Sequence, residues 1–335
     1  MKKLIYASLA LFLFSCGNTG PDVSKVPVDI QIDRFEQVFF KIDSNNAIPG
    51  LIGIEKQFPR FANDFTENIL GAGPISDTNK TLQVAAKHFI SSYTSVNDFL
   101  QKQFSDVSWL KPELKDAFQH VEYYFPKYRT PRIITFVGPF DAPGVALTPS
   151  GLAIGLQAYA GKDYPFYLSD QGQEIFPTYI SRRFEKKYIT VNCMKGVVED
   201  LFPDQSGRLS LIEQMVEKGK RWYLLDKFVP KADDSLKTGY TKRQLDWAKT
   251  NEGNVWNYML QQTDIFTTDP SFIQLYIGEG PSTQGFPENS PGNIGQWIGW
   301  QIVKAYADKN SSLTPQQVMQ TSAKAIFEGS KYKPK

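Results

Sequence analysis

Histidine and cysteine are scarce in this sequence, with two of each among 335 residues. The histidines are His88 and His120, and neither has a second histidine four residues away, the spacing at which the two imidazoles of an HExxH helix bind one zinc ion. Neither a Gly-x-Ser-x-Gly motif nor a P-loop occurs. We therefore predict no metal site, no cofactor and no catalytic residue.

The sequence also lacks an excess of charge of either sign. Its 37 lysine and arginine residues face 35 aspartate and glutamate residues, and two of the lysines, Lys2 and Lys3, lie within residues 1–15. The rest of the chain is formally neutral, whereas a nucleic-acid-binding protein normally carries a basic excess. Beyond the N-terminus no run of about 18 apolar residues occurs, so no transmembrane helix is predicted.

What the N-terminus does contain is the pattern of a bacterial export signal. Lys2 and Lys3 precede the apolar residues 4–14, a run of about 16 Å as a helix, too short to cross roughly 30 Å of hydrocarbon. The quartet that ends in Ser15 and Cys16 resembles the lipobox of bacterial lipoproteins. This resemblance implies cleavage before Cys16 and acylation of that cysteine, with palmitate as the expected acyl group.

The organisation predicted from these features is a signal peptide at residues 1–15, a lipidated tether at 16–27 and a single globular domain at 28–335. Gly20, Pro21 and Pro27 punctuate the tether. If Cys16 carries lipid, no intramolecular disulfide is possible, and the other cysteine, Cys193, is interpreted as a buried thiol in an apolar helix.

Apolar periodicity predicts an α+β fold that is mostly helical with a small sheet. Alternation from Val28 to Ile32 predicts a strand, and apolar runs at 132–137 and 151–156 predict two neighbouring strands joined by a loop. Residues 159–179 are expected to form a loop packed on the core. Helices are expected at 80–104, 112–124, 180–202, 211–228, 242–262, 291–307 and 312–327, with Ser210 and Glu213 forming a capping box before residue 211.

This order of elements resembles the zincin-like metallopeptidases, in which a late helix contributes a glutamate as third zinc ligand. Glu217 lies where that ligand would be, but one carboxylate does not hold catalytic zinc, and the simpler interpretation is a solvated helix residue. Glu199 is a second candidate of this kind, although beside Asp200 it is more simply a solvated charge. The fold class predicted is therefore a zincin-like architecture without HExxH.

A groove is the other candidate site. Gly295 and Gly299 share one helix face, which indicates close helix packing or, alternatively, a recognition groove lined by Trp297 and Trp300. Tyr159 would contribute to the same groove.

Several segments, in the same order, resemble the GldB family of gliding-motility lipoproteins of the Bacteroidetes over nearly the whole chain. The segments that carry the resemblance are 28–40 with Asp33, Arg34 and Phe35, 151–167 with Tyr159 to Asp163, 177–183, 215–219 and 291–299. The resemblance implies a membrane-anchored component of gliding and of type IX secretion, with a zincin-like fold that has lost its zinc motif. Gln157 departs from the aspartate expected in the family.

Three functions follow as hypotheses. The favoured one is a non-enzymatic component or assembly factor, a pseudoenzyme related to zinc metallopeptidases, whose partners are the membrane and other gliding or secretion proteins of the cell envelope. The alternative is a degenerate or cryptic hydrolase acting on cell-envelope protein or peptidoglycan. A third is a ligand-binding lipoprotein. Because residues 17–20 lack the acidic run associated with surface export in these bacteria, we expect a periplasm-facing location.

Overall fold

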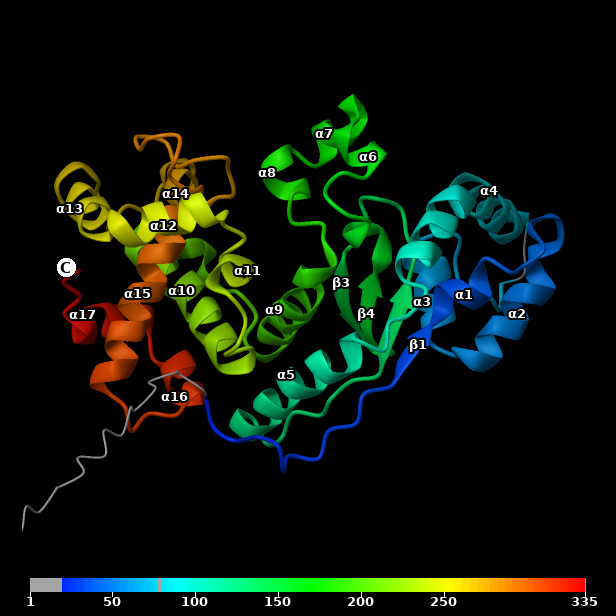
Figure 1. Ribbon diagram of the computed structural model, residues 1–335, viewed down its shortest axis with the longest axis horizontal. Helices are drawn as coiled ribbons and strands as arrows, with labels where there is room; N and C mark the ends of the chain where they lie inside the picture. The colour runs from blue at the N-terminus through cyan, green and yellow to red at the C-terminus, as the bar shows by residue number, and fades with distance from the viewer. Residues whose placement is uncertain (1–19, 78–79, 335) are drawn as a thin grey trace, which may run out of the picture.

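In the computed structural model, which describes residues 20–77 and 80–334, a small sheet stands between two groups of helices (Figure 1). The predicted signal peptide and Cys16 lie outside the described residues. Within them, no helix combines the length and the apolar character needed to span a membrane.

The sheet consists of β1 (Ile32–Arg34), β2 (Ile133–Phe136), β3 (Val145–Thr148) and β4 (Gly151–Gly155), in the spatial order β1-β2-β4-β3. β1, β2 and β4 are parallel, and β3 pairs antiparallel with β4 at the edge. The mostly helical α+β class with a small sheet is thus confirmed, as are the two neighbouring strands expected near 132–137 and 151–156.

The two central strands, β2 and β4, are buried on both faces of the sheet. Successive residues of a strand point to opposite sides, so the two faces contribute to different cores. Ile133 and Ile154 contribute to one apolar core, and Ile134 and Ala153 to a second. This is why β2 and β4 read as continuous apolar runs and not as alternating ones.

The second core belongs to the N-terminal helices α1 (Phe35–Phe39), α2 (Ala47–Gln57), α3 (Phe61–Asn68) and α4 (Lys80–Gln103). Phenylalanine rings fill it, and the centroid of Phe35 lies 4.9 Å from those of both Phe61 and Phe65. The fully buried carboxylate of Glu36 accepts hydrogen bonds from Arg34 at 2.5 Å and from Thr135 at 2.8 Å. These bonds tie α1 to β2.

The first core extends from the sheet into most of the remaining helices. They are α5 (Leu110–Tyr124), α6 (Pro165–Leu168), α7 (Asp170–Ile175), α8 (Thr178–Ser181), α9 (Ile189–Leu201), α10 (Leu211–Phe228), α11 (Asp234–Thr238), α12 (Lys242–Thr250), α13 (Glu252–Gln262), α14 (Pro270–Ile277), α15 (Ile294–Lys309), α16 (Pro315–Gln320) and α17 (Ala323–Ser330). The short helices α7 and α8 contribute no residue to this core and lie beyond one end of the sheet in Figure 1. Short 3₁₀ turns occupy Ser44–Asn46, Leu156–Tyr159, Lys186–Tyr188 and Ser206–Arg208.

α10 and α15 approach each other through glycines. A Cβ atom added at Gly219 would overlap the backbone of Gly299, and one added at Gly299 would overlap the carbonyl group of Met215. The capping box predicted before α10 is present, with the Ser210 hydroxyl 2.6 Å from the Glu213 carboxylate. Of the two interpretations of the glycine spacing in α15, the structure shows close helix packing.

Several element boundaries differ from the predictions. The strand expected at 28–32 is paired only from Ile32 onward, although Val28 and Ile30 are buried, because alternation reports burial and not pairing. β3 lies in the segment expected to be a loop, α14 was not predicted, and residues 159–179 contain short helices. The helix expected at 291–307 begins at Ile294, after Asn293 in a left-handed conformation with φ of 49°.

Other predicted helices are interrupted. The one expected at 242–262 breaks at Asn251, and the one at 312–327 breaks before Ser322, whose hydroxyl caps α17. The one at 180–202 begins only at Ile189. Apolar spacing continues across such short breaks, so periodicity alone does not reveal them.

Residues 20–27, assigned from the sequence to the tether, pack on the domain where the structure describes them. Val23 is buried, and the side-chain amide of Gln119 in α5 donates a hydrogen bond of 2.8 Å to the Val26 carbonyl. The packed part of the chain therefore begins earlier than Val28.

The close contact between Gly299 and α10 predicts that an added methyl group at this position destabilises the protein. Gly299→Ala forces α10 and α15 apart, and we expect it to lower the free energy of unfolding by about 1–3 kcal/mol in urea denaturation. Gly53→Ala is the matched control, since Gly53 lies in α2 with nothing within 4 Å of an added Cβ. It should stabilise the protein by up to about 1 kcal/mol because alanine favours helix. Equal effects of the two substitutions would contradict the role of the contact.

Candidate functional site

The structure does not bring the five candidate residues together. Trp297 and Trp300 are 2% and 1% exposed, and their rings meet edge to face with centroids 5.4 Å apart. The indole of Trp300 donates a hydrogen bond of 2.8 Å to Asp226. Tyr159 is also buried, and its hydroxyl accepts a bond of 3.1 Å from Asn192. All three aromatic side chains are thus part of the core.

The two glutamates each form an ion pair. Glu217 lies 2.7 Å from the ammonium of Lys220, which is almost fully buried and also donates to the carbonyl of Met319. Glu199 pairs with Arg221. Glu217 is partly buried and not simply solvated, whereas more than half of the Glu199 side chain is exposed.

The histidines and the described cysteine lie apart from one another. His88 is exposed on α4, and His120 is buried in α5 with its Nδ1 2.8 Å from the Asp116 carbonyl oxygen. Cys193 is a buried thiol, as expected, and burial raises its pKa. In the described ranges no three histidine, cysteine, aspartate or glutamate side chains are grouped so that they could hold a metal ion.

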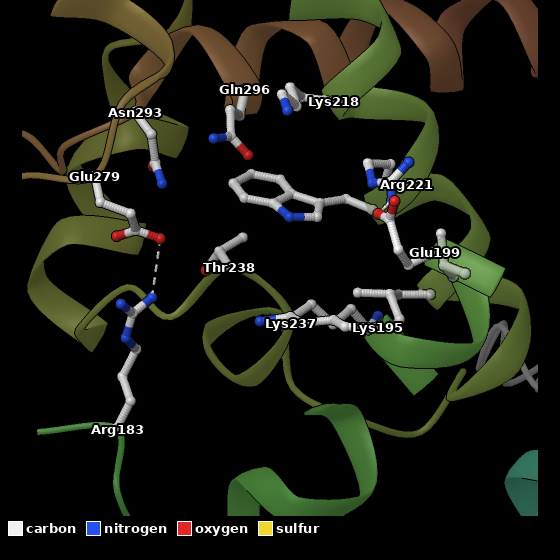
Figure 2. Close-up of a pocket in the computed structure, with 13 residues that line it drawn as sticks. Arg183, Lys195, Glu199, Lys218, Arg221, Lys237, Thr238, Glu279, Asn293 and Gln296 are labelled. Carbon is white, nitrogen blue, oxygen red and sulfur yellow. Dashed lines mark hydrogen bonds and ion pairs between the residues drawn. The ribbon is translucent and has the colours of Figure 1, made fainter. Parts of the chain in front are cut away.

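A polar pocket of 290 Å³ lies among α9, α10, α11 and the beginning of α15 (Figure 2). The figure shows Arg183 and Glu279 at one end, and Arg221 and Glu199 at the other. Its charged lining consists of Arg183, Lys195, Glu199, Lys218, Arg221, Lys237 and Glu279, with Thr238, Asn293 and Gln296 as neutral polar members.

Most cations of this pocket have an acidic partner. Arg183 lies 3.1 Å from Glu279, and Lys237 lies 2.7 Å from Asp226. Arg221 pairs with Glu199, and Lys218 pairs with Asp204. Lys195 is the exception, since its ammonium forms no hydrogen bond or ion pair with any residue in the described ranges.

Lys195 is only partly exposed, and its surroundings disfavour its charge. Burial, and to a smaller extent the nearby Arg183 guanidinium, lower the pKa of Lys195 to about 8, while Glu279 acts in the opposite direction. An unpaired cation of this kind is available to an anionic ligand or, when deprotonated, to chemistry that uses a free amine. Beyond Lys195 a second cavity, of 480 Å³, is lined by Tyr159 and Asn192.

Comparison with known proteins decides the family. The sequence matches the family of the gliding motility protein GldB over residues 17–334. The chain belongs to the GldB family. No curated protein and no solved structure matches it significantly.

The pocket joins segments that were singled out as GldB-like in the sequence. Arg183 comes from 177–183, Lys218 from 215–219, and Asn293 and Gln296 from 291–299. Segments far apart in the GldB chain thus meet at one polar cavity, and this cavity is the best candidate for its functional site.

Sequence reasoning identified one pocket residue, Glu199, as a candidate and missed the others. Lys195 did leave a signal, because it is the single charged residue between Tyr188 and Val198 on an otherwise largely apolar helix. Arg183 and Glu279 left none, since they lie in separate connections and meet only through folding.

The state of Lys195 predicts a pH-dependent gain of stability on its removal. Its pKa is 10.5 when unperturbed and about 8 in the fold, so the ammonium opposes folding fully below pH 8 and ceases to do so above about pH 10.5. We expect Lys195→Met to raise the free energy of unfolding by about 1–3 kcal/mol at pH 7 and to have little effect at pH 11.

Urea denaturation at the two pH values measures this difference. Lys56→Met, on the exposed face of α2, serves as control and should change stability by less than about 0.5 kcal/mol. A Lys195→Met protein less stable than wild type at pH 7 would show that the ammonium has a stabilising partner.

Proposed function

We propose that this GldB-family chain is a lipid-anchored, non-enzymatic component or assembly factor of the gliding motility and type IX secretion machinery, facing the periplasm. The observation that carries the proposal is the family match over residues 17–334. The export signal and the lipobox-like sequence before Cys16 support the anchor.

The ion pairs of the two glutamates support a non-enzymatic role. Glu217, at the position of a zincin's third ligand in the predicted zincin-like arrangement, neutralises the buried Lys220, and Glu199 neutralises Arg221. A carboxylate whose oxygens are held by a structural cation is less available to take a proton from a water molecule or a substrate.

The length of the tether gives the anchor a mechanical consequence. Gly20 lies against His120 and Pro230 of the domain, and Cys16 precedes it by four residues, which span at most about 14 Å. A lipid on Cys16 would therefore hold this edge of the domain close to the membrane surface, and leave the sheet and the N-terminal helices for contact with other envelope proteins.

Removing the lipid site should abolish the function. In a strain that lacks the gene, we expect Cys16→Ala protein to leave the membrane fraction and to restore neither gliding nor type IX secretion. Cys193→Ala is the matched cysteine control, since Cys193 is buried and free, and it should remain in the membrane fraction and be active. Full activity of Cys16→Ala at wild-type abundance would contradict the anchored component.

Glu217→Gln separates the proposal from the alternative of a hydrolase acting on envelope protein or peptidoglycan. It leaves Lys220 without a carboxylate, so we expect stability to fall by about 1–3 kcal/mol while gliding and secretion persist. Complementation assays together with immunoblots measure both. Loss of function at normal protein abundance would favour the hydrolase.

A further inference from the structure

The pocket beside Lys195 carries an excess of positive charge. Arg183 and Lys195 line it, and Arg182 lies behind them within electrostatic range of Arg183. Glu279 is the acidic group that acts on all three. The local balance is therefore three cations to one carboxylate, with Arg182 outside the pocket lining.

Arg182 does not relieve this excess, because its guanidinium is held by neutral acceptors. It donates to the carbonyl of Gly239 at 3.2 Å and to Oε1 of Gln244 at 2.9 Å. Burial and the neighbouring Arg183 lower the pKa of Arg182. Keeping these like charges close together lowers the stability of the fold. Such an arrangement is unusual unless an anion binds between the cations.

The wall opposite these cations also suits an anion. α15 begins there with Asn293, whose side chain does not cap the helix, and no acidic residue lies in its first turn. The N-terminus of a helix carries a partial positive charge. Two of the first amides of α15 already have acceptors, since Ile294 donates to the Thr283 hydroxyl at 3.3 Å and Gln296 to the Asn293 carbonyl at 2.9 Å. Thr238 and Gln296 also line the pocket, but the Thr238 hydroxyl donates to the Asp234 carbonyl at 2.8 Å and the Gln296 amide nitrogen donates to the Ile277 carbonyl at 2.6 Å.

We propose that this pocket binds the phosphate group of a small ligand, held by Lys195 and Arg183 beside the beginning of α15. A phosphate monoester carries a charge of about −1.5 to −2 at neutral pH and matches the surplus of two cations, whereas a single carboxylate leaves one uncompensated. The volume of 290 Å³ is near the lower end of small-molecule sites, about 300 Å³, and fits a small headgroup.

Isothermal titration of the full-length protein, in a phosphate-free nonionic detergent, tests this site with inorganic phosphate as the probe. We expect saturable binding by wild type, about tenfold weaker binding by Lys195→Met, and binding by Lys195→Arg within about threefold of wild type. Lys56→Met removes one positive charge outside the pocket and should bind as wild type does.

Three results would overturn the proposal: no saturable binding, an unchanged affinity of Lys195→Met, or acetate binding as tightly as phosphate. Misfolding does not confuse the comparison, because Lys195→Met is expected to be more stable than wild type. The test needs only purified protein, so its failure is separate from any failure in gliding or secretion.

The pH dependence gives a second readout, with sulfate as the probe because its charge is constant. The groups facing Lys195 across the pocket are Arg183, Glu279, Glu199, Arg221, Lys218 and Lys237. Since the pKa of Lys195 is about 8, wild-type affinity should fall between pH 7 and 9.5, while that of Lys195→Arg should not. Parallel loss in both proteins would assign the effect to another group.

Glycerol phosphate and dihexanoyl phosphatidic acid distinguish the two sources of such a group. Equal affinities for both indicate a soluble phosphate ester, and tighter binding of the acyl form indicates a lipid headgroup. Either result supports the phosphate site.

Discussion

The contact between Gly219 and Gly299 sets the spacing on which the C-terminal half depends. The two helix backbones lie closer there than any side chain would permit, and α10 in turn packs against the helices that surround it. The same approach places Lys218 and Arg221 of α10 opposite Asn293 and Gln296 at the beginning of α15. The width of the polar pocket is therefore a consequence of two residues that have no side chain.

The lysines of the core are paired with carboxylates, whereas Lys195 in the pocket is not. Lys220 and Lys237 are almost fully buried, yet each has a carboxylate within 2.7 Å. Lys195 has no such partner, and burial together with the nearby Arg183 lowers its pKa. In a fold that neutralises its other buried lysines so closely, this exception carries the argument for a ligand.

The place where the N-terminal segment meets the domain determines how the proposed lipid anchor would hold it. Residues 20–27 run along α5, and Gly20 lies beside Pro230, so the lipid proposed at Cys16 would orient the domain as well as tether it. The Phe-rich N-terminal helices lie on the far side of the sheet in Figure 1, away from this segment. The polar pocket lies among α9, α10, α11 and the beginning of α15.

Local patterns in the sequence sufficed for what depends on neighbours along the chain. The sequence predicted the strands β2 and β4, the capping box of Ser210 and Glu213, the burial of Cys193 and the family. These predictions were possible because apolar runs, capping and family motifs are local patterns. The break at Asn251 and the edge strand β3 were not predicted, since each depends on what packs against it.

The residues that line the candidate site are brought together only by the tertiary structure. Trp297 and Trp300 looked like groove residues in the sequence, but the close approach that Gly299 allows buries them against α10 and its neighbours. Arg183 and Glu279 are 96 residues apart, yet they pair at the mouth of one cavity with Lys195. The sequence by itself predicted an export signal and most of the longer helices and strands, because both depend on contiguous residues. Which charges face one another without compensation depends on how distant segments pack, and only the folded chain shows it.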